Sequence, residues 1–114
     1  MLVLKTAMEL SEKKCIPCEG GVPKLNPQEA DDLNQQLKSP WNIVDIMKII
    51  KTFEFENFIE TMSFVNKVAD ISEEEGHHPV MHVFYAKVEI EIWTHAIMGL
   101  SENDFILAAK IEKI

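Results

Sequence analysis

The stretch VMHVFYAKVEIEIWTH, residues 80–95, decides the fold class, because apolar and polar residues alternate along two runs that flank a short break. A period of two residues is typical of β-strands that have one face buried. The break falls at Ala86 and Lys87. We therefore expect a β-hairpin in which these two residues form the turn.

The expected register assigns each residue of this hairpin to one face of the sheet. The core face would consist of three opposed pairs: Tyr85–Val88, Val83–Ile90 and Met81–Ile92. On the other face His82 would lie opposite Glu91, which we interpret as a surface pair. At the open end the same register sets His78 opposite His95, and directly opposed residues have Cβ atoms about 5 Å apart. Two imidazoles that are distant in sequence would therefore meet at the rim of the sheet.

The rest of the chain continues this mixture of helix and strand patterns. Asn26 and Pro27 suit the start of a helix, and Pro40 closes the same segment. The expected elements are a helix at 26–39, strands near 41–46 and 49–56, a helix from 57 to about 73, the hairpin, and a last helix from Ser101. The order α-β-β-α-β-β-α predicts an α+β domain, a four-stranded antiparallel sheet with three helices packed on one face.

The first 25 residues do not follow this pattern and predict an irregular lead segment, 1–25, ahead of a domain at 26–114. Prolines and glycines are concentrated in it. It also carries the two cysteines, Cys15 and Cys18, as a single CxxC motif, which is compatible with a zinc half-site or a redox pair. A zinc site would need two histidines in addition. We favour two thiols in an irregular segment, and we expect no metal.

The composition limits the classes of function. The 114 residues, 46% hydrophobic and 26% charged, fit one globular domain. The net charge is −8 and all 11 basic residues are lysines, which argues against nucleic acid, because phosphate-reading surfaces need a basic patch and often arginine. No apolar run approaches the roughly 20 residues of a membrane helix, and the N-terminus does not resemble a secretory leader. We expect a cytoplasmic or nuclear protein with a small-molecule ligand and no membrane partner.

The segment EEEGHHP, residues 73–79, is the clearest candidate for a functional site. The chain has four histidines, and two of them are adjacent here, directly after three glutamates. Negative charge at the C-terminal end of a helix opposes the helix dipole, and such breaks of a local rule often mark functional sites. Because carboxylates and neighbouring imidazoles alter each other's protonation, the segment could supply one charged and one neutral imidazole for acid–base chemistry.

These residues form a longer pattern with others downstream. The pattern E-x3-HHP-x5-Y-x9-H-x8-D is made by Glu73, His77, His78, Pro79, Tyr85, His95 and Asp104. It resembles the signature of the pterin-4a-carbinolamine dehydratase family, also described as dimerisation cofactors of a homeodomain transcription factor. The resemblance covers about residues 20–114. Many members have tryptophan two residues after the proline, where Met81 stands here, and a thioether contacts a flat ring less rigidly.

The resemblance implies a hydro-lyase that dehydrates 4a-hydroxytetrahydropterin to quinonoid dihydropterin in tetrahydrobiopterin recycling, by histidine acid–base catalysis and without a cofactor. It implies His77, His78 and His95 as acid, base and substrate-positioning groups, with the assignment among the three left open. The supporting or substrate-binding residues would be Glu73, Pro79, Met81, Thr94 and Asp104. The alternative function is a protein-binding module that stabilises transcription-factor dimers. The resemblance also implies a homotetramer built as a dimer of dimers.

Overall fold

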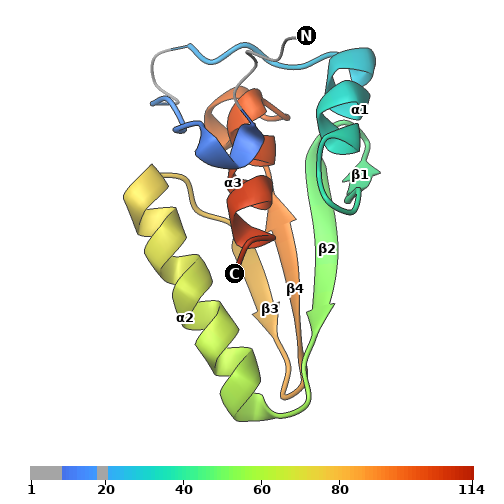
Figure 1. The fold of residues 1–114 in the computed structure, drawn as a ribbon. Helices are drawn as coiled ribbons and strands as arrows, with labels where there is room; N and C mark the ends of the chain where they lie inside the picture. Colours follow the sequence, from blue (N-terminus) through green and yellow to red (C-terminus); the bar gives the residue numbers. More distant parts are fainter. Residues whose placement is uncertain (1–8, 18–20) are drawn as a thin grey trace, which may run out of the picture.

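The computed structural model describes residues 9–17 and 21–114 and confirms the expected order of elements (Figure 1). The elements are η1 (Leu10–Glu12), α1 (Pro27–Gln35), β1 (Asn42–Val44), β2 (Lys48–Glu54), α2 (Phe58–Glu75), β3 (Val80–Val83), β4 (Lys87–Ile92), η3 (His95–Ile97) and α3 (Glu102–Ile111). The strands form one antiparallel sheet in the order β1-β2-β4-β3. The α+β class with four strands and three helices is therefore correct.

The helices cover one face of the sheet, and the core lies between the two layers (Figure 1). Strand residues of alternating position point into it, and Ile49, Ile90 and Ile92 are completely buried. From α3, Phe105 and Leu107 are also completely buried. The opposite face of the sheet carries the polar half of the alternation, as the period of two predicts. Among the described residues, no helix is both long enough and apolar enough to cross a bilayer.

The hairpin forms, but its turn was predicted one residue too late. Phe84 N–H donates to the carbonyl oxygen of Lys87 at 2.8 Å, so the turn residues are Tyr85 and Ala86. Two contacts from outside the hairpin hold this turn: Phe55 N–H donates to the Ala86 carbonyl at 2.8 Å, and the Thr61 hydroxyl donates to the Tyr85 carbonyl at 2.9 Å. The sequence of the hairpin alone does not predict these tertiary hydrogen bonds.

The new turn changes the partner of each strand residue by two positions and leaves the face of each unchanged. Met81 pairs with Ile90 and Val83 pairs with Val88. Tyr85 leaves the strand and is 77% exposed, so its expected place in the core was wrong. His82 lies opposite Glu89, not Glu91. The ladder ends before His78 and His95, so these two histidines are not an opposed pair.

Element boundaries differ from the expectation where tertiary contacts intervene. The first helix ends at Gln35, several residues before Pro40, because the Asn34 side chain turns to bond both backbone groups of Trp41, at 2.9 Å and 2.8 Å. The first strand is shortened to β1 by a turn in which Asp45 and Ile46 have positive φ, 54° and 57°. The capping box expected at the start of α1 is present.

The described part of the lead segment packs onto α3 and has more order than expected. Leu10, in η1, is 4% exposed and belongs to the core. Asn103, itself buried, binds the backbone of Ile16 twice, accepting from its N–H at 3.0 Å and donating to its carbonyl at 2.8 Å. Cys18 lies outside the described residues, and Cys15 is a free, half-buried thiol. Neither the zinc nor the redox interpretation of the CxxC motif is tested.

Candidate active site

The end of α2 sets the direction in which the histidine pair leaves the helix. The helix stops at Gly76, whose φ of 66° is the left-handed conformation that glycine adopts without a steric penalty. The N–H groups of Gly76 and His77 both reach the Ser72 carbonyl, which closes the helix end. His77 therefore leaves the helix in a fixed direction. The residue is only 5% exposed, unusually low for histidine, and its side chain points into the domain.

The buried partner of His77 is Asp104, in the first turn of α3. Nε2 of His77 lies 2.6 Å from Oδ1 of Asp104, and both side chains are almost completely shielded from solvent. The other oxygen, Oδ2, accepts hydrogen bonds from the Thr94 hydroxyl at 3.0 Å and from the Ser101 N–H at 2.8 Å. One carboxylate thus connects the segment after α2 with the segment after β4. This connection places Thr94, the chain neighbour of His95, on the same carboxylate as His77.

The contact with Asp104 also indicates which nitrogen of the His77 ring is the hydrogen-bond donor. An ionised carboxylate offers only acceptors, so Nε2 of His77 carries the hydrogen in this contact. A buried carboxylate that orients an imidazole in this way is a recurrent arrangement in acid–base sites. The capping box predicted at Ser101 and Asp104 exists, yet capping is only one of the two tasks of this carboxylate.

His78 has a separate carboxylate partner and a different environment. Its Nε2 lies 2.6 Å from Oε2 of Glu73, one helical turn back along α2, and both side chains are exposed to solvent. Adjacent histidines thus sit in opposite surroundings, one buried and one open to solvent. Glu73 at the acidic end of α2 is matched by an imidazole that can carry the compensating charge.

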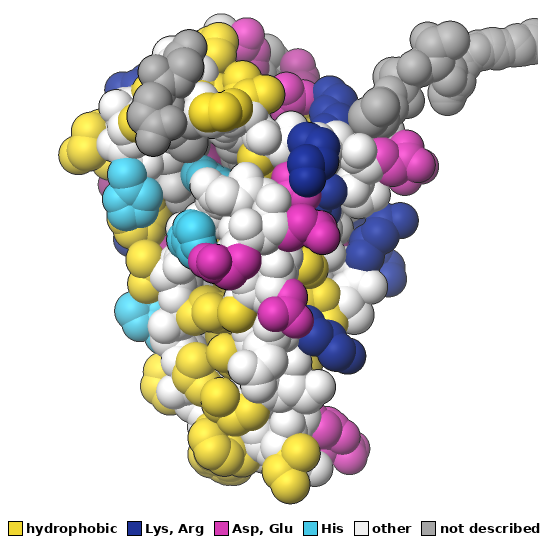
Figure 2. Space-filling model, turned by 90° about the vertical axis from the view of Figure 1, so that its left-hand side faces the viewer, with side chains coloured by type: hydrophobic (Ala, Val, Ile, Leu, Met, Phe, Trp, Pro, Cys, Tyr) yellow, Lys and Arg dark blue, Asp and Glu magenta, His cyan; other side chains and the backbone are white. Residues whose placement is uncertain are grey.

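His95 opens the short η3 helix and is exposed. Its ring stacks on the indole of Trp93, with centroids 4.4 Å apart and planes inclined by 31°. Trp93 was not among the residues singled out from the sequence, although its position next to Thr94 and His95 could have drawn attention to it. Figure 2 shows histidine side chains spread along one face of the molecule, beside acidic and hydrophobic side chains.

Glu75, the last residue of α2, anchors the lead segment beside this cluster. Its side chain is 1% exposed, accepts a hydrogen bond from the Cys15 N–H at 2.9 Å and lies 3.2 Å from Nζ of Lys110. Burial by itself would raise the pKa of the Glu75 carboxyl, but the Cys15 N–H and Lys110 outweigh burial and lower it. Burial, together with the Glu75 and Asp104 charges, raises the pKa of the Cys15 thiol to about 12. No local pattern around Glu75 or Cys15 predicts this contact.

The remaining predicted residues, Pro79 and Met81, lie at the start of β3. Pro79 lies between the histidine pair and β3 and is half-buried. Met81 is partly buried and packs against the hydrophobic core, and its contact with the substrate stays a prediction. A groove of about 650 Å³ lies elsewhere, between the lead segment, α1 and α3, and none of the four histidines lines it. The candidate site is therefore the cluster at His77 and Asp104, which lies apart from this groove.

Comparisons with known proteins identify the family of the chain. The family model described as "Pterin 4 alpha carbinolamine dehydratase" matches residues 23–114. A protein from Rickettsia canadensis, named as a candidate pterin-4-alpha-carbinolamine dehydratase, is 52% identical over 103 residues, which are 90% of this chain and 94% of that protein. A protein of the same name from Nitrosomonas eutropha is 51% identical over 106 residues, 93% of each chain.

Two solved structures share the fold. A transcriptional coactivator/pterin dehydratase from Brucella melitensis superposes with a TM-score of 0.75 at 27% identity, covering 80% of this chain and 97% of that one. A pterin dehydratase-like protein identified as a RuBisCO assembly factor in the alpha-carboxysome superposes with a TM-score of 0.56, also at 27% identity, over 64% of this chain and 86% of that one.

Proposed function

Because the chain belongs to the pterin 4 alpha carbinolamine dehydratase family, we propose that it dehydrates 4a-hydroxytetrahydropterin to quinonoid dihydropterin by histidine acid–base catalysis. The observation that carries this proposal is the Asp104 carboxylate, which binds His77 and Thr94 and so joins the two histidine-bearing segments. We further propose tetrahydrobiopterin recycling as the setting and the cytoplasm as the place. Neither a metal nor a cofactor is needed for the reaction.

The chemistry requires one proton donor and one proton acceptor at the same ring system. The 4a-hydroxyl leaves as water once it is protonated, and a ring N–H gives up its proton as the new C=N bond forms. Imidazoles serve both tasks near neutral pH, and each positioned acid or base accelerates such a step by about 10²- to 10⁴-fold. His77, His78 and His95 are the proposed acid, base and substrate-positioning groups. Single-histidine variants assign the role of each.

Two carboxylates and an indole complete the proposed site. Asp104 would hold the buried His77 ring, and Glu73 would hold the exposed His78 ring, each by a 2.6 Å contact at Nε2. Thr94 would position Asp104 from the other side. Trp93, which already stacks on His95, offers a flat surface of the kind that a bicyclic pterin contacts. Pro79 would fix the loop that links the histidine pair to β3, while Met81 supports the sheet.

The test is the decay of the carbinolamine, followed by absorbance, with wild-type protein and single variants. We expect His95→Ala and Glu73→Gln, which change exposed side chains, to lower the rate without unfolding the domain. The adjacent Glu74, also exposed on α2, supplies the matched control, and Glu74→Gln should keep the wild-type rate. Because His77 is buried, His77→Ala is to be checked for folding by circular dichroism. Wild-type rates in both His95→Ala and His77→Ala would end the proposal.

A second candidate function is binding to a transcription factor. It is favoured by the name of the Brucella melitensis structure, transcriptional coactivator/pterin dehydratase. It is also favoured by an exposed apolar tip, in which Ile59 at the start of α2 is 82% exposed and Tyr85 of the hairpin turn is 77% exposed (Figure 2). The acidic net charge of −8 suits a protein partner better than DNA.

The same exposed apolar side chains support our proposal of a homotetramer, a dimer of dimers. Several large apolar residues gather at this end of the molecule, and exposed apolar patches often mark protein–protein interfaces. Sedimentation of the wild-type chain and of Ile59→Asp separates the possibilities. A tetramer that dissociates in Ile59→Asp supports the proposal, and a wild-type monomer contradicts it. Capture of a transcription factor by a variant that lacks His95 would show that binding and catalysis use different surfaces.

A further inference from the structure

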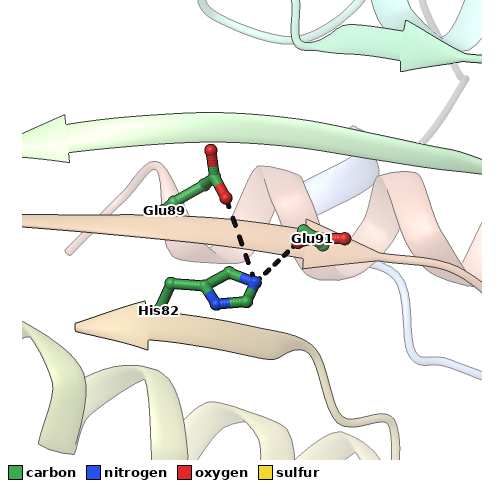
Figure 3. A group of neighbouring side chains, drawn as sticks. All are labelled: His82, Glu89 and Glu91. Atoms are coloured by element: carbon green, nitrogen blue, oxygen red, sulfur yellow. Dashed lines mark hydrogen bonds and ion pairs between the residues drawn. The ribbon is translucent and has the colours of Figure 1, made fainter.

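A second histidine–carboxylate cluster lies on the open face of the sheet, where the proposed dehydratase chemistry does not use it. His82 of the edge strand β3 and two glutamates of β4, Glu89 and Glu91, point toward one another on the face turned away from α3 (Figure 3). Nε2 of His82 lies 2.6 Å from Oε2 of Glu91 and 3.9 Å from Oε1 of Glu89. The three potential donor atoms all lie within 4.8 Å of one another.

From this geometry we propose that His82, Glu89 and Glu91 form a divalent transition-metal site, with Zn²⁺ as the best-suited ion. One imidazole nitrogen and two carboxylate oxygens are a donor set that Zn²⁺ accepts, and three protein ligands leave a fourth position for water. Tetrahedral bonds of about 2.0–2.1 Å place the ligand atoms about 3.3 Å apart. The two distances from His82 differ from that value by about 0.7 Å, which side-chain rotation supplies.

The cluster stands on two paired strands, which hold its three side chains on one face of the sheet. Glu89 is the direct ladder partner of His82, and Glu91 is the next residue of β4 on the same face. Sites built on strands hold their ligands more closely than sites built on loops. The bound ion would therefore join the edge strand β3 to β4. It would stiffen the strand that follows the histidine pair.

Charge also suits a cation. Lys48 of β2 lies 2.8 Å from Oε1 of Glu91, the oxygen that faces away from His82, and thereby directs Oε2 toward the proposed ion. With neutral His82, the two carboxylates and Lys48 leave one net negative charge for the ion to meet.

A simpler reading is that protonated His82 itself bridges the two glutamates as a surface ion cluster. Titration of Zn²⁺ into the protein by calorimetry separates the two readings. Both cysteines are first replaced, Cys15→Ser and Cys18→Ser, so that thiolates cannot take up the ion. We expect one equivalent to bind, and affinity to fall by at least about tenfold in His82→Ala and in Glu91→Gln.

The exposed pair His78–Glu73 is the matched control, because it has the same 2.6 Å contact but only one carboxylate. Glu73→Gln should leave the Zn²⁺ affinity unchanged. In two-dimensional NMR of the histidine side chains, Zn²⁺ should shift the His82 signals and leave those of the buried His77 in place. Absence of binding, equal binding by Glu91→Gln, or a shift confined to other histidines would overturn the proposal.

Discussion

Replacing Asp104 by asparagine keeps the shape of the side chain but turns one acceptor oxygen into a donor. The carboxylate accepts from His77, Thr94 and the Ser101 N–H, and an amide cannot serve all three. If the NH₂ group of the asparagine faces Ser101, it meets the Ser101 N–H, so that two donors face each other. With its NH₂ group toward His77, the imidazole must release the hydrogen on Nε2 and change tautomer. Either orientation disturbs the alignment of His77.

The size of the effect follows from the burial of the pair. A hydrogen bond to a charged group contributes about 1.5–3 kcal/mol, and a buried unpaired donor costs a similar amount. We expect Asp104→Asn to lower the free energy of unfolding by about 2 kcal/mol, which corresponds to a fall in Tm of about 8 °C for a domain of this size. If His77 takes part in proton transfer, the dehydration rate should fall by about 10²-fold or more.

Thermal unfolding and carbinolamine decay, measured on the same preparations, check both numbers. Thr94→Val serves as the comparison, because it removes one donor to Asp104 and leaves the His77 contact in place. We expect it to lose less stability than Asp104→Asn and to lose less than about tenfold in rate. An Asp104→Asn protein that is destabilised but dehydrates within about twofold of wild type would refute the reasoning, because Asp104 would then only cap α3.

Three further predictions concern the lead segment. Glu75→Gln should lower Tm near pH 7. Because the pKa of Glu75 is lowered on folding, its stabilisation is present above the ordinary carboxyl pKa of about 4.3 and is lost as pH falls through the lower folded value. A difference in Tm between wild type and variant that persists in acid would contradict this prediction. Asn103→Ala frees the backbone of Ile16, and trypsin should then cut the lead segment about tenfold faster, whereas an unchanged rate would argue against the clamp. Cys15, with a thiol pKa of about 12, should react with iodoacetamide at pH 8 about a thousandfold more slowly in the folded chain than in denaturant, and peptide mapping that shows fast labelling would contradict its burial.

The parts of this molecule that the sequence predicts are those set by local patterns. The period of two along residues 80–95 identified the hairpin, and the capping pattern at Ser101 and Asp104 located the start of α3. The position of the hairpin turn was missed because Thr61 and Phe55, from other elements, hold its carbonyl groups. Such contacts exist only after the chain has folded.

The same distinction applies to the candidate site. The spacing of the histidines could be recognised as a pattern, but the division into a buried His77 and an exposed His78 could not. That division arises because Gly76 ends α2 and directs one ring inward, toward a carboxylate 27 residues away. The burial of Glu75 under the lead segment was equally unpredictable, because a glutamate at a helix end is ordinarily solvated.

The most direct test of the central claim is NMR of the histidine side chains during titration with a dihydropterin, a stable relative of the proposed substrate. If imidazoles from the two segments face one ligand, the signals of His77, His78 and His95 should shift together and saturate with one dissociation constant. His82, on the open face of the sheet, supplies the internal reference and should not move. A dihydropterin that leaves His95 unchanged while shifting His77, or that shifts none of the three, would contradict a shared site.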